Sequence, residues 1–292
     1  MKILQAEHLG MCFGVRDAIA LAMEHADEQP LTILGDLVHN ETVLAGLREH
    51  GIQIADQPNA IRTKRVMITA HGTSQSSLNR LKEQKHTVLE ATCPLVHFAH
   101  RSLAKLASAG FHPIIIGKAD HIEVRGMTGD LIEYDVVLSE ADIAKLEEHS
   151  RFGIVSQTTQ PIEKVRHLVE LIRQRFPQSE IRFTDTVCQP TKNRQTAAVN
   201  LAKQCDVVIV IGGSQSNNTR ELVTTCERFC VRVFHVQTAD DLQMEWFENV
   251  EKVGITAGTS TPDRMIDEVE KRIHAFAKTQ REKSFHPVFF NQ

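Results

Sequence analysis

The chain has 292 residues, a length that fits two or three domains of ordinary size. Its hydrophobic fraction of 41% and charged fraction of 24% exclude a mostly disordered, collagenous or coiled-coil protein. The formal net charge of −4 gives no general electrostatic reason to bind nucleic acid or an anionic membrane. The longest apolar runs fall far short of the roughly 20 residues that span a bilayer. Because the first residues lack the apolar stretch of a signal peptide, we expect a cytoplasmic protein.

Short apolar runs alternate with amphipathic segments along the whole chain. This alternation predicts parallel sheets covered by helices, with ligands bound beyond the carboxyl ends of the strands. Helices are expected over 17–26, 103–109 and 162–176, the last with apolar residues at helical spacing. The predicted strands are, in chain order, 2–5, 31–35, 66–69, 113–116, 136–138, 153–156, 207–211, 231–234 and 253–256.

Six cysteines are present without a CxxC pair, which removes the thioredoxin-like and zinc-ribbon interpretations. Cys12, Cys93 and Cys188 each lie at a strand-end turn, just before a helical segment. Three thiolates that meet at one point suit an iron–sulfur cluster with one open iron, since an electron-transfer cluster ordinarily takes four cysteines. Zinc is the competing metal for such a set. The other three cysteines are expected to be small core residues in helical stretches: Cys205, Cys226 and Cys230.

Two further polar strand ends follow each of these cysteines in the same order. The first comes at almost the same separation from the cysteine each time, at His39, His121 and Ser216. The second comes later in each segment, at His71, Thr158 and Ser260. The recurring order indicates three related structural units.

These units are expected to be α/β units with mainly parallel sheets, over residues 1–90, 91–184 and 185–283. If they pack as a pseudo-threefold trefoil, their strand ends converge and the three cysteines meet around a central iron–sulfur cluster. The tail, residues 284–292, carries three phenylalanines and is expected to pack on the body.

The polar strand ends supply imidazoles, hydroxyls and amides. His39, His71 and His121 can bind a phosphate or diphosphate, particularly when protonated. Backbone N–H groups at helix N-termini favour the same anions. Neither a Walker loop nor a GxGxxG motif is present, so nucleotide hydrolysis and dinucleotide binding have little support. Neutral donors come from three more residues: Ser216, Asn218 and Ser260.

Glu123 lies two residues after His121. In an extended or tightly turned segment, side chains at this spacing point the same way. A carboxyl group there can share the cavity with the imidazole and act as a proton donor.

A series of short motifs follows one order along nearly the whole chain, and the set is far more specific than any member. The motifs are Cys12-Phe13-Gly14-Val15, Val38-His39-Asn40, Ala70-His71-Gly72, Ala91-Thr92-Cys93-Pro94-Leu95-Val96, His121-Ile122-Glu123-Val124, Gln157-Thr158-Thr159, Asn193-Arg194-Gln195, Ser216-Asn217-Asn218 and Thr256-Ala257-Gly258-Thr259-Ser260. Through them the chain resembles the IspH (LytB) family of 4-hydroxy-3-methylbut-2-enyl diphosphate reductases, from Met1 to about Ala277.

The resemblance implies a [4Fe–4S] cluster held by three cysteines, with one open iron that binds the substrate alcohol. By motif match the ligands are Cys12, Cys93 and Cys188. It also implies reductive dehydroxylation of (E)-4-hydroxy-3-methylbut-2-enyl diphosphate to isopentenyl and dimethylallyl diphosphate, the last step of the non-mevalonate isoprenoid pathway. No flavin or nicotinamide motif is visible, and the resemblance implies an external ferredoxin or flavodoxin as the electron donor.

The motif match also implies roles for single residues. Glu123 matches the proton donor and Thr158 the threonine beside the reacting hydroxyl. Four positions depart from the pattern of many members: Asp120 replaces a glycine, Ile122 a proline, Arg125 a glutamate and Asn217 a second serine. Arg125 is expected to lower the pKa of Glu123. The substrate-binding positions match His39, His71, His121, Thr158, Ser216, Asn217, Asn218 and Ser260.

Two other classes of function remain open on the sequence. One is a different three-cysteine trefoil cluster enzyme, quinolinate synthase-like or diphthamide-synthesis-like, which lacks this combination of histidines with Glu123 and Gln157-Thr158-Thr159. The other is a non-catalytic cluster sensor, which has no use for a proton donor beside an open iron.

Overall fold

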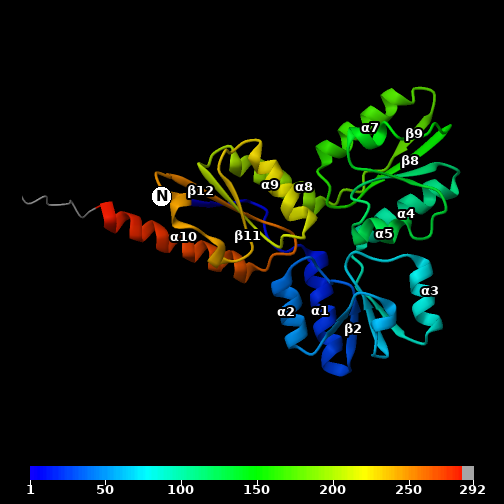
Figure 1. The fold of residues 1–292 in the computed structure, drawn as a ribbon, viewed down its shortest axis with the longest axis horizontal. Helices are drawn as coiled ribbons and strands as arrows, with labels where there is room; N and C mark the ends of the chain where they lie inside the picture. The colour runs from blue at the N-terminus through cyan, green and yellow to red at the C-terminus, as the bar shows by residue number, and fades with distance from the viewer. Residues whose placement is uncertain (285–292) are drawn as a thin grey trace, which may run out of the picture. The chain divides into compact units, whose positions relative to one another are not determined.

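All strand pairings within residues 1–284, the part of the chain that the computed structural model describes, are parallel. The strands form three four-stranded sheets, each with helices beside it, as the alternation of apolar runs predicts (Figure 1). Two sheets lie in one unit, residues 12–192, and the third lies in a second unit, formed by residues 1–11 and those from 193 onward. Except for Ser284, the tail expected to pack on the body lies outside the described residues.

The first sheet of the unit 12–192 has the strand order β3-β2-β4-β5. Alternate residues of β2 and β4 point to opposite faces, as the twofold period of a strand requires. Ile33 and Met67 therefore pack against two helices on one face, and Val66 and Ile68 pack toward a third helix on the other. The strands are β2 (Leu31–Leu34), β3 (Gln53–Ala55), β4 (Arg65–Ile68) and β5 (Thr87–Glu90), and the helices are α1 (Phe13–Glu28), α2 (Glu41–Glu49), the short 3-10 helix η1 (Pro58–Ala60) and α3 (Gln75–Glu83).

The second sheet of this unit has the order β7-β6-β8-β9. Ile114 and Ile116 pack against the helix α7 on one face, while Ile115 packs on the opposite face against α4 and α5 (Figure 1). The strands are β6 (His112–Ile116), β7 (Asp135–Val137), β8 (Arg151–Ser156) and β9 (Glu180–Phe183), and the helices are α4 (Pro94–Ser108), α5 (Ile122–Thr128), α6 (Glu140–Ile143) and α7 (Ile162–Arg175).

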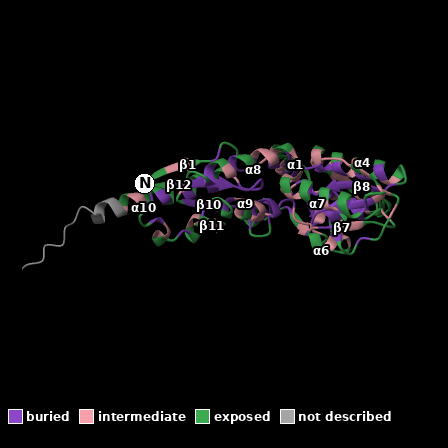
Figure 2. Ribbon diagram, turned by 90° about the horizontal axis from the view of Figure 1, so that it is seen from above, coloured by how far each residue is buried: buried purple, intermediate pink, exposed green. Residues whose placement is uncertain are grey.

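The third sheet has the order β1-β12-β10-β11. Its central strand β10 is buried along its whole length, and its residues alternate between two apolar cores, one under α10 and one under α8 and α9 (Figure 2). The strands are β1 (Lys2–Gln5), β10 (Val207–Ile211), β11 (Val233–Val236) and β12 (Lys252–Ala257), and the helices are α8 (Gln189–Ala202), α9 (Asn217–Glu227), the 3-10 helices η2 (Ala239–Asp241) and η3 (Met244–Phe247), and α10 (Asp263–Ser284).

All nine predicted strands are present, with ends that differ by at most two residues. The expected helices are also present as parts of α1, α4 and α7. Three strands were not predicted: β3, β5 and β9. Each is an edge strand of three or four residues that is partly exposed, so its sequence lacks the continuous apolar run of a central strand.

The first strand of the chain does not join the sheet of its own segment. β1 pairs with β12 in parallel, from Lys2 opposite Lys252 to Gln5 opposite Ile255, and so lies in the third sheet. A short strand at a chain terminus can reach any free sheet edge, and its sequence carries no mark of its partner. The division into segments 1–90, 91–184 and 185–283 remains a prediction.

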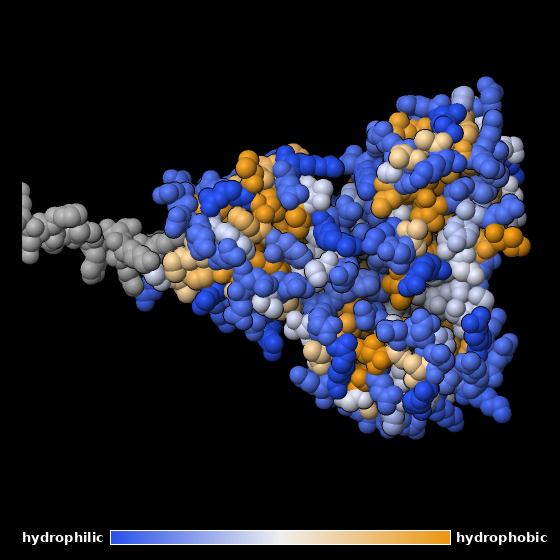
Figure 3. Space-filling view, in the orientation of Figure 1, coloured by the Kyte–Doolittle hydropathy of each residue, from blue (hydrophilic) through white to orange (hydrophobic). Residues whose placement is uncertain are grey.

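The surface mixes hydrophilic residues with separate hydrophobic patches on the face shown in Figure 3. Within the described part of the chain, none of the helices has the length and apolar character that a bilayer crossing requires. The large apolar side chains that are exposed are Phe13, Phe98, Ile132, Tyr134, Phe229 and Val231.

Candidate active site

Three cysteines, Cys12, Cys93 and Cys188, form what we call the thiol triad, and each directly precedes a helix, as the sequence predicts. Each cysteine carbonyl oxygen accepts a helical hydrogen bond from an amide four residues later. The thiols thus stand at helix N-termini, where the helix dipole favours a negatively charged group such as a thiolate. The bonds run to the three cysteines from Arg16 N at 3.0 Å, His97 N at 3.0 Å and Lys192 N at 3.1 Å.

The thiol triad lies close to Glu123. Burial raises the pKa of Cys93, and it raises the pKa of Cys188 to about 11. In both cases the negative charges of Cys12 and Glu123 add to the rise, which places all four groups within electrostatic range of one another. Because burial keeps Cys93 and Cys188 protonated, they become thiolates when a cation binds them.

Gly14 allows Cys93 to approach helix α1. A Cβ atom on Gly14 would lie 2.5 Å from Cys93 Sγ and 3.1 Å from its Cβ. The N-terminal ends of α1 and α4 therefore pack so closely that a side chain at position 14 has no room. This contact explains why a glycine follows Cys12 by two residues.

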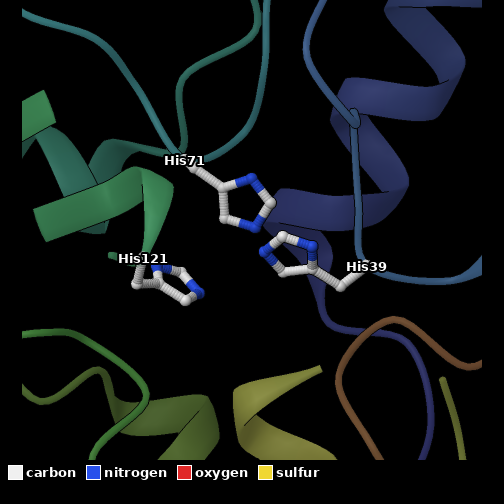
Figure 4. Close-up of side chains that lie close together, drawn as sticks. All are labelled: His39, His71 and His121. Carbon is white, nitrogen blue, oxygen red and sulfur yellow. The ribbon is translucent and has the colours of Figure 1, made fainter. Parts of the chain in front are cut away.

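Three histidines, His39, His71 and His121, form a second set, the imidazole triad (Figure 4). Their ring centroids are 4.6 Å apart for His39 and His71, 5.1 Å for His39 and His121, and 5.6 Å for His71 and His121. His39 follows β2, His71 follows β4 and His121 follows β6, so the carboxyl ends of two sheets bring them together. This arrangement confirms that the three strand ends meet.

The two triads differ in spacing. Among the described residues, only the imidazole triad is a set of three ligand groups whose atoms all lie within 4.8 Å of one another. A zinc ion holds thiolates at about 2.3 Å, which puts neighbouring sulfur atoms about 3.8 Å apart. Cys12, Cys93 and Cys188 are not such a set within the described residues. Three thiols at helix N-termini fit a cluster of several irons, in which each cysteine binds a different iron atom.

His71 is a neutral imidazole. Burial holds its pKa well below the usual range, and the charges of His39 and His121 lower it further. Its Nδ1 atom is buried without a hydrogen-bond partner. A buried polar atom without a partner is unfavourable, so His71 favours a ligand that can hydrogen-bond to it.

The position of His121 determines which of its nitrogens can donate. His121 is the N-cap of α5, and its Nδ1 accepts a hydrogen bond from Glu123 N at 3.1 Å. A neutral His121 in this position carries its proton on Nε2. The Nε2–H group is then a donor for an anionic oxygen.

Glu123 and Thr158 form a buried pair. Glu123 Oε1 accepts a hydrogen bond from Thr158 N at 2.6 Å, and Glu123 Oε2 lies 3.0 Å from Thr158 Oγ1. The carboxyl is 1% exposed, and burial raises its pKa to about 7, against the lowering effect of the two hydrogen bonds. Glu123 is therefore poised to give or take a proton near neutral pH.

The expectation that Arg125 lowers the pKa of Glu123 was wrong. Both residues lie on α5, Arg125 is exposed, and it is not among the groups that shift the Glu123 pKa. Side chains two residues apart on a helix point to different sides, so the guanidinium faces solvent instead of the carboxyl. Glu123 likewise stands in the first turn of a helix instead of in an extended segment.

The loop that carries Thr158 is held by a glutamine whose function the sequence did not reveal. Gln157 is fully buried, and its Oε1 accepts hydrogen bonds from Lys118 N and Gln160 Nε2, both at 3.1 Å. Lys118 lies in the loop that leads to His121. Gln157 thus ties the loops of Thr158 and His121 together. The motif Gln157-Thr158-Thr159 includes this glutamine, but the sequence does not indicate what its side chain contacts.

The remaining predicted site residues lie in the other unit and are described within it. Ser216 caps α9, with its Oγ accepting from Thr219 N at 3.3 Å. Asn218 Oδ1 accepts from Thr259 N at 2.9 Å, while its Nδ2 is buried without a hydrogen-bond partner. The end of β12 is therefore bonded to the start of α9. This arrangement brings together the predicted residues of this unit: Ser216, Asn217, Asn218 and Ser260.

The cysteines outside the thiol triad are core residues, as expected. Cys226 and Cys230 are buried in one apolar cluster, and Cys205 packs against it. Their expected placement was partly wrong, because only Cys226 lies in a helix. Cys205 and Cys230 lie just after α8 and α9, respectively.

Several similar proteins share one enzyme name. A family model described as LytB protein matches residues 3–274. A 4-hydroxy-3-methylbut-2-enyl diphosphate reductase of Geobacter metallireducens is 37% identical over 280 residues, which cover 94% of this chain and 97% of the relative. A reductase with the same name from Alkaliphilus oremlandii is 36% identical over 280 residues, 94% of this chain and 99% of the relative.

Two solved structures have the same fold. The E-1-hydroxy-2-methyl-but-2-enyl-4-diphosphate reductase of Plasmodium falciparum superposes with a TM-score of 0.86 at 28% identity, covering 94% of this chain and 87% of that one. A second structure, of (E)-4-hydroxy-3-methyl-but-2-enyl diphosphate reductase, the terminal enzyme of the non-mevalonate pathway, gives a TM-score of 0.68 at 35% identity, covering 94% and 100%. On the family match and these identities, the chain belongs to the LytB protein family, which uses an iron–sulfur cluster.

Proposed function

We infer that the chain is the reductase that removes the hydroxyl group of (E)-4-hydroxy-3-methylbut-2-enyl diphosphate, the terminal step of the non-mevalonate isoprenoid pathway. In this reaction two electrons and two protons convert the alcohol to isopentenyl or dimethylallyl diphosphate and water. The observation that carries the inference is the buried Glu123 carboxyl, with a pKa of about 7, beside the thiol triad. A non-catalytic cluster sensor has no use for this acid.

The thiol triad is proposed to hold a [4Fe–4S] cluster. Its three helix N-termini favour thiolates, the form in which cysteine binds such a cluster. When bound, such a cluster supplies the electrons and a Lewis-acidic iron for the departing hydroxyl. An external ferredoxin or flavodoxin is the proposed electron donor, and the cytoplasm remains the predicted compartment.

Glu123 is proposed to deliver a proton through Thr158. In the structure Thr158 N donates to Glu123 Oε1 and Thr158 Oγ1 donates to Oε2, at 2.6 and 3.0 Å. When the carboxyl is protonated, we place its proton on Oε2, and the hydrogen bond to Thr158 Oγ1 reverses. The threonine hydroxyl can accept this proton's hydrogen bond while donating its own proton to the substrate hydroxyl. Loss of water then returns the negative charge to Glu123, which takes up the next proton from solvent at neutral pH.

The imidazole triad is proposed to bind the diphosphate. His121 offers Nε2–H, and His71 offers a buried nitrogen that lacks a partner. An anion among the three rings also favours their protonated forms, which strengthens each hydrogen bond. The diphosphate is thereby fixed away from the reacting carbon, which orients that carbon toward Thr158. The roles of Ser216, Asn217, Asn218 and Ser260 in substrate binding remain predictions.

The test is anaerobic reconstitution with iron and sulfide, followed by Mössbauer spectroscopy with and without the hydroxylated diphosphate. The proposal predicts four irons per chain and one distinct iron whose signal shifts when the substrate is added. Turnover with a chemical reductant should then yield both diphosphate products. Zinc without iron, or a cluster whose spectrum ignores the substrate, would contradict the proposal.

A further inference from the structure

The sulfur atoms of the thiol triad differ in their polar neighbours. Cys93 is surrounded by backbone amides, those of Leu95 and Val96. Cys188 has the amide of Thr191 and, in addition, a side-chain hydroxyl: Cys188 Sγ and Thr191 Oγ1 are 3.1 Å apart. Thr191 was not among the site residues predicted from the sequence.

The Thr191 hydroxyl is held in place by its surroundings. Thr191 is fully buried in the first turn of α8, and its amide donates to Cys188 O at 3.0 Å. The side chain therefore has little freedom to turn away from the sulfur. In the free thiol the S–H group donates to the hydroxyl oxygen. A metal-bound Cys188 has lost this proton, so the hydroxyl must become the donor and the sulfur the acceptor.

This inference rests on the proposed cluster. We propose that Thr191 is a positioning residue that acts through Cys188: its hydroxyl donates a hydrogen bond to the cluster ligand Sγ and raises the reduction potential. Reduction adds negative charge that is shared by the ligand sulfurs. A donor aimed at one of them stabilises the reduced state more than the oxidised state, and hydrogen bonds to the sulfurs are among the factors that set such potentials.

The burial of Thr191 should make the effect of its hydrogen bond on the reduction potential large enough to measure. A hydrogen bond to a charged group is stronger in a site of low dielectric constant than in water, and Thr191 has no exposed surface. Cys93 serves as the internal contrast, because its backbone donors cannot be removed by substitution. Thr191 is thus the point at which a side-chain change can alter the electronic environment of the cluster without altering a ligand.

The experiment compares T191V with T191S in the reconstituted holoenzyme. Valine replaces the hydroxyl with a methyl group of similar size, and serine retains the hydroxyl. In an EPR-monitored redox titration, T191V should show a more negative midpoint. At a fixed solution potential, the ratio of reduced to oxidised cluster in T191V should be about threefold to tenfold lower than in the wild type. This is the size expected for partial loss of a charge-assisted hydrogen bond. T191S should titrate like the wild type.

Thr225→Val is the matched control. Its hydroxyl donates to a backbone carbonyl, Glu221 O at 2.6 Å, on helix α9. This variant should keep the wild-type potential. If T191V assembles no cluster, T191A repeats the comparison, since alanine also lacks the hydroxyl.

Two results would overturn the inference. One is a T191V cluster with full iron content and an unchanged midpoint. The other is the failure of both hydroxyl-free variants to hold iron, which would assign Thr191 a purely structural role. A wild-type chain that binds no iron–sulfur cluster would instead contradict the proposed function, so the two failures are distinguishable.

Discussion

The imidazole triad and the thiol triad lie in the same unit, and burial acts on their protons in opposite directions. Burial lowers the pKa of His71 and raises the pKa values of Cys93 and Cys188. Both changes favour the neutral form of the side chain, because a low dielectric penalises charge. Burial thus limits the charge that His71, Cys93 and Cys188 bring to this unit.

In the proposed function each triad becomes charged when its own ligand binds. A diphosphate favours protonated imidazoles, so its binding takes up protons, whereas iron takes thiolates, so its binding releases them. The comparison teaches that one buried region can accept an anion and a cation-rich cofactor side by side. It also predicts that the two triads can be disabled separately.

The largest effect is expected from Cys93→Ser. A serine oxygen is a poor ligand for the soft iron–sulfur cluster, so iron binding and turnover should be lost together. Pyrophosphate binding, measured by calorimetry, should persist because the imidazole triad is intact. Cys205→Ser is the control, because Cys205 packs against an apolar core in the other unit. Retention of four irons by C93S would remove Cys93 from the ligand set.

Glu123→Gln should have the next largest effect, a loss of turnover. The amide keeps the shape of the carboxyl but cannot supply its proton, so kcat should fall by about a hundredfold to ten-thousandfold. Iron content and KM should change little. Glu163→Gln, at an exposed position of α7, controls for the substitution itself. A kcat within about threefold of wild type would show that another group donates the proton.

The pH profile of the same pair of proteins gives a second test. In the proposed mechanism the acid form of Glu123 is the active form, and its pKa is about 7. Wild-type kcat should therefore decline as the pH rises through about 7, since the carboxyl then ionises. The residual activity of E123Q should lack this step. A step that persists in E123Q would belong to a different group.

His71→Asn should have a smaller effect, and mainly on binding. Loss of a charge-assisted hydrogen bond to phosphate should raise KM by about tenfold to a hundredfold with kcat less affected. Calorimetry at pH 7.5 in buffers of different ionisation enthalpy should show proton uptake on pyrophosphate binding by the wild type and less uptake by H71N. His167→Asn, an exposed residue paired with Glu140 at 3.0 Å, is the control. Equal proton uptake by both proteins would contradict the role of His71.

The central strands and the site residues of the unit 12–192 were predictable for one reason. Apolar runs such as that of β6 mark buried strands, and chemistry on parallel sheets gathers where those strands end. The rule matches the positions of Cys93 and His71, just beyond β5 and β4, and of Glu123, in the helix after β6. The rule says nothing of edge strands such as β9, whose residues face solvent on alternate positions.

Residues that act through a contact in space were harder to predict. Thr191 lies three residues from Cys188 in the sequence, but a threonine in a helix carries no sign of a special role. Only the structure shows its hydroxyl beside Cys188 Sγ. The exposure of Arg125 required the helical turn of α5. The partner of β1 required the whole third sheet. In each case the deciding fact is the direction of a side chain or the pairing partner of a strand, and neither can be read from the order of residues.

Gly14→Ala should have the smallest effect and the sharpest selectivity between the triads. The new Cβ would meet Cys93 Sγ at 2.5 Å, so the sulfur must shift from its place beside α1. Overpacking of this kind costs about 1–3 kcal/mol, and here it falls on a ligand atom. Iron content after reconstitution should drop severalfold. Pyrophosphate affinity should stay within about twofold of wild type, because the substitution leaves the contacts of the imidazole triad unchanged.

Gly46→Ala is the matched control, because a Cβ there meets no atom within 4 Å and the residue lies in helix α2, where alanine is favoured. It should leave both iron content and pyrophosphate binding unchanged. Parallel losses of iron and pyrophosphate binding in G14A would show that the two triads are mechanically coupled through α1 and α4. Loss of iron alone would show that the thiol triad depends on the close packing of its helix N-termini while the imidazole triad does not.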